Sequence, residues 1–202
     1  MIIDMSTNAE RAGLLTSRRG VGFAILIFLA SCEPAKGPTS FPNQSLAGTD
    51  GQPHALIDPN AKLTVVEFFS IHCPCQREHD QRLRDLASAY AARGVTFVAV
   101  DSEVGATIER DRNEATLRAY PYPILIDDHG TVARALAADY ATYSVLVNHD
   151  GQVLYSGGID SDKSHLQDDA APFLRDAIDD ALAGRPLRRT EAKALGCSLE
   201  LP

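Results

Sequence analysis

The sequence lacks an excess of positive charge, a long hydrophobic run and any internal repeat. It carries 19 lysines and arginines against 27 aspartates and glutamates, for a formal net charge of −8 over 202 residues. An acidic chain without a basic stripe argues against nucleic-acid binding. The apolar stretch from Val21 to Ala30 is too short to span a bilayer comfortably as a helix. A hydrophobic content of 45% is enough for one domain with a full core.

The N-terminus has the features of a secretory signal. Arg18 and Arg19 precede the apolar stretch, which ends in Leu29-Ala30-Ser31-Cys32, a small-residue cleavage site. This ending resembles the lipobox of bacterial lipoproteins, which implies cleavage before Cys32 and lipid on its sulfur. We therefore expect a signal peptide over residues 1–31, a flexible linker over residues 32–45, and a lipid-anchored protein in the cell envelope, facing the periplasm or exterior. A plain signal peptide or an uncleaved anchor is the alternative.

Cysteine is scarce, and its count is informative. The chain has four cysteines. If Cys32 carries lipid, then Cys73, Cys75 and Cys197 remain, and an odd number leaves at least one thiol free or paired with a partner. Such a set would be unusual for purely structural cysteines in an oxidising compartment. The count therefore favours reactive thiols.

Cys73 and Cys75, separated by Pro74, lie where a strand is predicted to lead into a helix. The residues from Leu63 to Phe69 are mostly β-branched or aromatic, which predicts a strand buried on both faces. From Gln76 onward apolar residues recur at helical spacing. A sulfur at the start of a helix faces unpaired N–H groups and the positive end of the helix dipole, which favour thiolate over thiol. Buried structural thiols are the alternative interpretation.

Two neighbours of the cysteine pair are candidates for supporting roles. A protonated His72 would favour the thiolate, although it is also interpretable as an ordinary loop histidine. Glu67, in the middle of the apolar strand, is a candidate carboxyl with a raised pKa that handles the proton. It could equally face a polar patch.

The rest of the chain alternates strands and helices and then forms a hairpin. Strand patterns lie at 95–100, 124–126, 144–147 and 152–155, the last two flanking Asn148-His149-Asp150-Gly151. A last helix is predicted between Pro172 and Gly184, followed by an extended tail that carries Cys197. This order predicts an α/β fold with a central mixed β-sheet flanked by helices on both faces. We assign the folded domain to residues 46–186 and the tail to residues 187–202.

Several segments together resemble the thioredoxin fold. They are Val65-Val66-Glu67-Phe68-Phe69, the cysteine–proline turn into a helix, Tyr120-Pro121-Tyr122-Pro123-Ile124-Leu125-Ile126-Asp127, and the hairpin. More narrowly, the chain resembles redoxins of the alkyl hydroperoxide reductase/thiol-specific antioxidant superfamily, in particular the peroxiredoxin-like group. The resemblance implies that Cys73 is the nucleophile, that Glu67 is the buried acid, and that Thr142 stands in the substrate-docking loop where the family has a cis-proline.

The hypothesis from the sequence is a membrane-anchored thiol–disulfide oxidoreductase without a cofactor or metal. Cys73 would attack the disulfide of a partner protein and Cys75 would resolve the mixed disulfide, with Cys197 as the alternative resolving cysteine. A thiol peroxidase is the main alternative, because Ser70-Ile71-His72-Cys73-Pro74 resembles the segment around a peroxidatic cysteine. A Cu(I)-binding chaperone is another, with Cys73, Cys75 and a histidine, His72 or His79, as ligands. The other histidines are expected at the surface, and residues 160–169 in a solvated loop; these histidines are His54, His129, His149 and His165.

Overall fold

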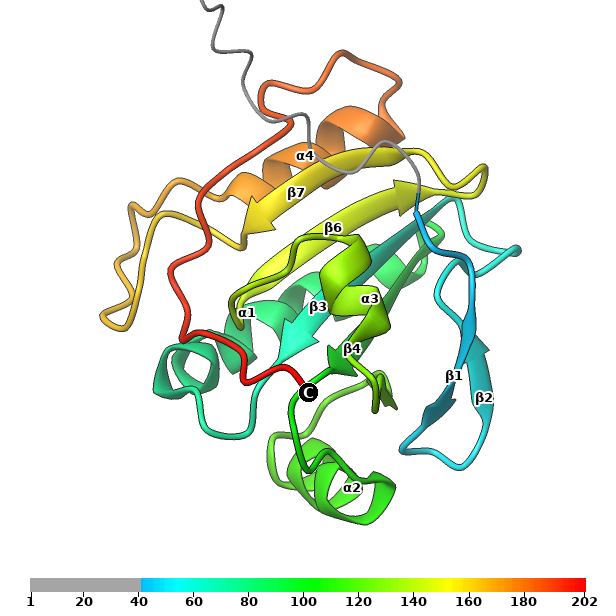
Figure 1. The fold of residues 1–202 in the computed structure, drawn as a ribbon. Coiled ribbons are helices and arrows are strands. Elements are labelled where there is room, and N and C mark those ends of the chain that lie inside the picture. Colours follow the sequence, from blue (N-terminus) through cyan, green and yellow to red (C-terminus); the bar gives the residue numbers. More distant parts are fainter. Residues whose placement is uncertain (1–40) are drawn as a thin grey trace, which may run out of the picture. The chain divides into compact units, whose positions relative to one another are not determined.

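A seven-stranded mixed sheet organises residues 41–202, the part of the chain that the computed structural model describes (Figure 1). The strands are β1 (Ser45–Gly48), β2 (Pro53–Ala55), β3 (Leu63–Phe69), β4 (Val95–Asp101), β5 (Ile124–Ile126), β6 (Tyr143–Asn148) and β7 (Val153–Gly158). The helices are α1 (Pro74–Ala91), α2 (Ile108–Leu117), α3 (Thr131–Ala135) and α4 (Phe173–Leu182). The predicted signal peptide, most of the linker and Cys32 lie outside the described residues.

The strand β3 lies at the centre of the sheet, whose order is β2-β1-β5-β4-β3-β6-β7. It pairs in parallel with β4 and antiparallel with β6, and each of its residues is buried. A parallel pair needs a long crossover, which here is α1. The prediction of a strand buried on both faces, followed by a helix that begins next to Cys73, is therefore confirmed.

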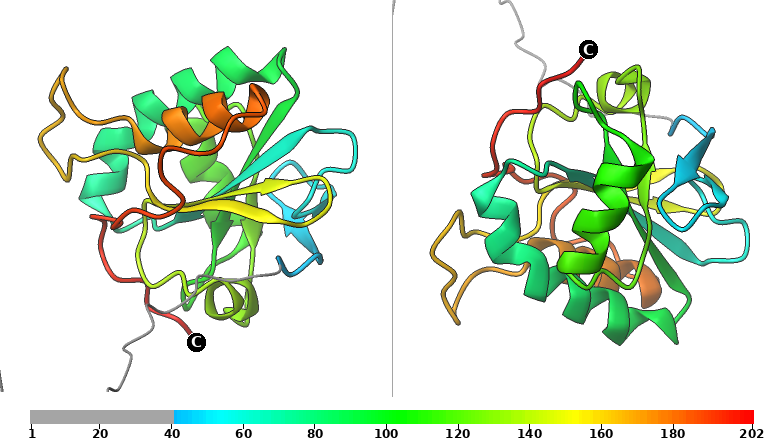
Figure 2. Two further views of the ribbon diagram at one scale, coloured as in Figure 1. Left: turned by 90° about the horizontal axis from the view of Figure 1, so that it is seen from above. Right: turned by 90° about the horizontal axis from the view of Figure 1, so that it is seen from below.

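Helices cover both faces of the sheet (Figure 2). Val65 and Phe69 of β3 pack with α1 and α4 in one apolar cluster, whereas Val66 and Phe68 point to the opposite face, which α3 covers. This division follows from the alternation of side chains along a strand. The predicted α/β architecture, with a mixed sheet between helices, is confirmed. In the described part of the chain, no helix combines the length and the apolarity needed to cross a bilayer.

The residues after α4 follow a defined path across the domain (Figure 1). The tail first pairs with the edge strand β7, where the N–H of Ser156 donates to Thr190 O at 3.0 Å and the N–H of Ala192 donates to Ser156 O at 3.1 Å. It then passes the start of α1 and reaches the α3 side, where Leu199 joins the apolar cluster. Backbone hydrogen bonds, rather than a helix or strand, hold this tail in place.

Candidate active site

Cys73 is the N-cap of α1, at the end of the loop that follows β3. Its backbone is extended, with φ −85° and ψ 106°, and its Sγ accepts a hydrogen bond from the N–H of Gln76 at 3.4 Å. Pro74 fits the first helical position because that residue needs no N–H donor. The sulfur thus takes the place that a serine or threonine oxygen usually fills at a helix start.

A second backbone N–H reaches the same sulfur from the C-terminal tail. The N–H of Cys197 donates to Cys73 Sγ at 3.3 Å. Two donors and the positive end of the α1 dipole therefore stabilise negative charge on this sulfur. Only 1% of Cys73 is exposed. The sulfur is therefore covered, in part by the C-terminal tail of the same chain.

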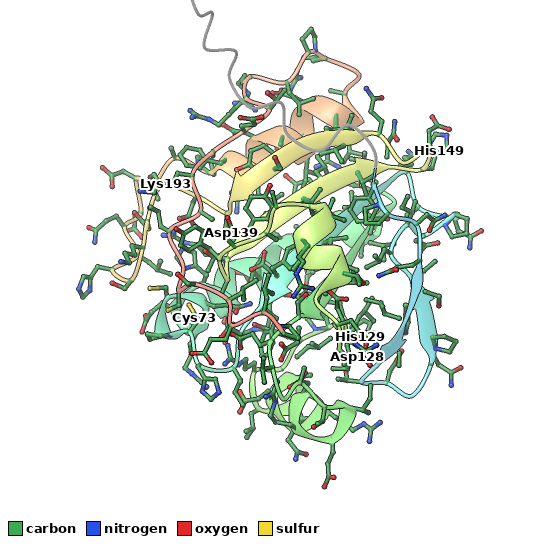
Figure 3. The ribbon with its side chains drawn as sticks, in the orientation of Figure 1. Cys73, Asp128, His129, Asp139, His149 and Lys193 are labelled. Atoms are coloured by element: carbon green, nitrogen blue, oxygen red, sulfur yellow. The ribbon has the colours of Figure 1, made fainter. Side chains whose placement is uncertain are left out.

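The three cysteines of the described residues come together at this point. The Sγ atoms of Cys73, Cys75 and Cys197 all lie within 4.8 Å of one another, and none of them is in a disulfide. Cys75 is 5% exposed and Cys197 is half-buried. Burial, together with the neighbouring thiols of Cys73 and Cys75, raises the pKa of Cys197 to about 12. Figure 3 shows Cys73 at the start of α1, directly beside the tail.

The loop from Asp139 to Thr142 holds the tail over Cys73. The N–H of Ala141 donates to Cys197 O at 2.9 Å, and the N–H of Leu199 donates to Asp139 O at 2.9 Å. Thr142, the predicted docking residue, is buried with a left-handed backbone at φ 67°. The predicted docking loop is therefore occupied by the tail of the same chain.

Gly196 allows this close approach. A Cβ atom built on Gly196 would lie 1.7 Å from Ala141 O and 2.8 Å from Thr142 Oγ1. Real Cβ atoms do not approach a backbone oxygen so closely, so the tail fits this loop only with glycine at position 196.

We expect Gly196→Ala to displace the tail and expose Cys197. Alkylation of Cys197 by iodoacetamide, followed by mass spectrometry of the reduced protein, should speed up by at least about tenfold, the factor that corresponds to about 1.4 kcal/mol of lost contact. Gly184→Ala is the control for a glycine substitution outside this contact, because a Cβ on Gly184 meets nothing within 4 Å, although its φ of 65°, unlike the φ of Gly196, lies in the left-handed region. Equal alkylation rates in the two variants would contradict the role given to Gly196.

Glu67 lies in β3 on the face that α1 covers, and 1% of it is exposed. Ser144 is its cross-strand partner in β6 and donates a hydrogen bond from Oγ to Glu67 Oε2, whereas Oε1 has no partner among the described residues. Burial raises the pKa of Glu67 to about 8; the hydrogen bond from Ser144 lowers it and the charge of Asp80 raises it further. The raised pKa predicted for this carboxyl is present, while its role in proton transfer stays a prediction.

The two histidines near the cysteines differ in their surroundings. His72 is exposed, and its backbone N–H donates to Ser70 Oγ at 3.2 Å. His79 is buried, with Nδ1 2.7 Å from Cys75 O and Nε2 3.1 Å from Asp160 Oδ1. Both ring nitrogens of His79 are therefore engaged in hydrogen bonds, and neither is free to bind a metal ion. The side chain that lies beside the thiols of Cys73 and Cys75 is the thiol of Cys197.

The pair of His79 and Asp160 corrects the expectation for residues 160–169. Residues 161–169 form the expected loop of exposed and half-buried residues, but the first residue of the segment, Asp160, is buried and also pairs with Arg82 at 2.6 Å. Burial alone would lower the pKa of His79, but its hydrogen bonds to Asp160 and to the Cys75 carbonyl raise it above its ordinary value. The ion pair thus fastens His79, and through it the Cys75 carbonyl in the first turn of α1, to the residues just after β7.

The remaining histidines lie at the surface, three of them exposed and one half-buried, as expected. His129 and His149 are exposed and lie far from Cys73 in Figure 3. His165 is exposed as well, and His54 is half-buried and pairs with Asp50 at 2.8 Å.

The sequence interpretation missed four residues that position the site: Gln76, Ser144, Asp160 and Gly196. A signal existed for Gln76, because cysteine followed three residues later by glutamine resembles a helix capping box. Half of this box forms, because Cys73 Sγ accepts the N–H of Gln76, whereas Gln76 Oε1 accepts the N–H of Ser70 at 2.7 Å rather than that of Cys73 and so fixes the loop before it. The other three act through contacts between distant parts of the chain.

Comparison with known proteins gives one family and many similar structures. Residues 36–170 match the family model described as Redoxin. An uncharacterized conserved protein from Geobacillus kaustophilus is 27% identical, with a TM-score of 0.76 over 83% of this chain and 93% of that chain. A comparison with curated proteins found no match.

Two further structures are less similar in sequence. A peroxidoxin from Mycobacterium tuberculosis is 20% identical, with a TM-score of 0.52 over 73% of this chain and 94% of that chain. The thioredoxin domain of a thiol-disulfide oxidoreductase from Bacteroides vulgatus is 17% identical, with a TM-score of 0.53 over 61% of this chain and 89% of that chain. At such identities the similarity shows the fold alone, and the predicted thioredoxin-like fold is confirmed.

Proposed function

Because the chain belongs to the Redoxin family, we propose that it is a thiol–disulfide oxidoreductase with Cys73 as nucleophile and Cys75 as resolving cysteine. One observation carries the proposal. The Cys73 sulfur accepts two backbone N–H groups at the start of α1 and has two further thiols within 4.8 Å. Cys73 attacks as a thiolate, whose charge these donors can hydrogen-bond, and the neighbouring thiols can complete the exchange.

The reaction proceeds in two exchanges. The Cys73 thiolate attacks one sulfur of a client disulfide, which forms a mixed disulfide and releases the other client sulfur as a thiolate. Cys75 then loses its proton and attacks Cys73 Sγ, which breaks the mixed disulfide and forms a Cys73–Cys75 disulfide. The client gains two electrons and two protons, and the protein loses them. With an oxidised protein and a reduced client, the same steps run in reverse.

Cys197 is the alternative resolving cysteine, since its sulfur lies in the same cluster as that of Cys75. In the described arrangement its tail also covers Cys73 and occupies the loop that includes Thr142. A protein client therefore has to displace the tail before its disulfide reaches Cys73. The lipobox-like segment ending in Cys32 supports a tether that would present this site at the surface of a membrane.

Thiol peroxidase is the second candidate, and the burial of Cys73 favours it. A site that is 1% exposed admits a small peroxide more easily than a disulfide of a folded protein. Cys73 would attack the terminal oxygen, break the O–O bond, become a sulfenic acid and release an alcohol or water. A second cysteine would then form a disulfide and release water.

A single-cysteine variant distinguishes the two reactions. In Cys75→Ala/Cys197→Ala, neither resolving thiol remains, so the first covalent product on Cys73 should accumulate. For the reduced variant, intact-mass spectrometry after incubation with a disulfide-bonded protein should show a stable mixed disulfide. Rapid conversion by peroxide to sulfenic acid, without any mixed disulfide, would contradict exchange and support peroxidase. The triple variant that also carries Cys73→Ala is the matched control and should form neither product.

A further inference from the structure

We propose that Cys73, Cys75 and Cys197 form a binding site for a soft monovalent cation, Cu(I). The proposal goes beyond disulfide exchange and does not depend on it. It differs from the Cu(I) alternative weighed from the sequence, because the third ligand is a cysteine from the tail and not a histidine. The three sulfurs come from the loop before α1, the first turn of α1 and the C-terminal tail.

The spacing of the sulfurs fits a three-coordinate ion. Metal–thiolate bonds are about 2.3 Å long, so three sulfurs placed evenly around one ion lie about 4 Å apart. The Sγ atoms of the three cysteines lie within 4.8 Å of one another, so each has to move by less than about 1 Å. A disulfide joins only two of them and leaves the third thiol unused, whereas an ion uses all three.

The donor set selects the kind of ion. Within residues 41–202 the cluster holds three thiols and neither an imidazole nor a carboxylate. Thiolates suit Cu(I), whereas hard cations such as Mg²⁺ and Ca²⁺ need oxygen ligands. Structural Zn²⁺ sites take four ligands, and the nearest buried histidine, His79, has both nitrogens engaged by Cys75 O and Asp160.

The charges around the sulfurs favour a bound cation. Three thiolate sulfurs within 4.8 Å of one another would repel each other, because their negative charges share a small space. A bound cation reverses this effect and releases the protons of its ligands. The N–H groups of Gln76 and Cys197 that point at Cys73 Sγ would orient this ligand from outside the ion's own shell.

The site is largely formed before any ion binds. The loop at Asp139 and Ala141 already holds the tail in place, and Gly196 allows the backbone to approach within contact distance. Little chain ordering is then required on binding, which favours affinity. A bound ion shared by Cys197 and Cys73 would also link the tail to the start of α1.

The test is an anaerobic titration of the full reduced chain with Cu(I) in competition with the chelator bicinchoninate. One Cu(I) per chain should be withdrawn from the chelator, and all three thiols should become protected from alkylation. Cys197→Ser should weaken binding by more than the roughly 10-fold to 100-fold that the loss of an outer hydrogen-bond partner costs. Ser198→Ala, in the next residue of the tail, is the matched control and should bind like the wild type.

Two outcomes would overturn the three-cysteine site. One is that Cu(I) stays with the chelator, and the other is that Cys197→Ser binds as tightly as the wild type, which would leave a two-cysteine site. Circular dichroism and thermal unfolding of Cys197→Ser exclude misfolding as the cause of weak binding. A chain that exchanges disulfides but ignores Cu(I) contradicts this proposal alone, and one that binds Cu(I) without exchange contradicts the proposed function alone.

Discussion

Cys73→Ser should slow thiol–disulfide exchange by roughly a thousandfold or more, because a serine hydroxyl does not ionise near neutral pH and cannot form a disulfide. The measurement is the rate at which the reduced protein reduces a small aromatic disulfide that releases a coloured thiolate. The variant keeps the geometry of the site, because serine is a favourable N-cap and can accept the N–H of Gln76 as Cys73 Sγ does. The thermal unfolding midpoint should therefore change little.

The matched variant for this experiment is Cys75→Ser, which leaves the nucleophile in place. It should still release the first equivalent of coloured thiolate and then stop or slow, because resolution by Cys75 is lost. The fast first equivalent in Cys75→Ser, and its absence in Cys73→Ser, separates attack from resolution. A Cys73→Ser variant that keeps more than about a tenth of the rate would contradict the assignment of Cys73 as nucleophile.

Glu67→Gln should stabilise the protein at alkaline pH. Burial raises the pKa of Glu67 from 4.5 to about 8 in the folded state, so the folded state binds this proton more tightly than the unfolded state. The resulting stabilisation is complete below pH 4.5 and is lost as the pH rises to about 8. At about 1.36 kcal/mol for each pKa unit, the free energy of unfolding falls by an amount on the order of 5 kcal/mol. A glutamine at this position does not ionise, so the variant lacks this decrease.

Urea unfolding of the wild type and the variant between pH 4 and pH 9.5, under reducing conditions, checks this result. The stability of the variant relative to the wild type should rise with pH and become constant above the pKa of about 8. Glu78→Gln is the matched control, because Glu78 is exposed on α1, and its substitution should give no such trend. A difference between Glu67→Gln and the wild type that does not vary with pH would contradict a carboxyl that is neutral when folded.

The local parts of the site could be predicted from the sequence, and the long-range parts could not. The β-branched and aromatic residues of Leu63–Phe69 fix a buried strand, and Pro74 with the apolar spacing after it fixes a helix start. These two features place Cys73 at the junction without knowledge of the rest of the fold. They also place Glu67 inside the sheet, where burial alone raises its pKa.

The contacts that complete the site join residues far apart in the chain. Cys197 meets Cys73 across 124 residues, and Asp160 meets His79 across 81 residues. No local pattern encodes such pairings, because they depend on the sheet order and on the path of the tail. The sequence allowed the tail to fold back, and the structure shows where it lies. Ser144 was missed as the partner of Glu67 for the same reason, because the two residues are 77 positions apart in the sequence.

The backbone pairing of the tail with Ser156 has a consequence for the assembly of the protein. An uncovered outer strand offers its free N–H and C=O groups to another chain, and many natural proteins protect such strands. In this molecule the segment that brings Cys197 to Cys73 also shields part of β7 at Ser156. Release of the tail to admit a client would therefore uncover a surface prone to self-association, so the open form should be short-lived or stabilised by the client itself.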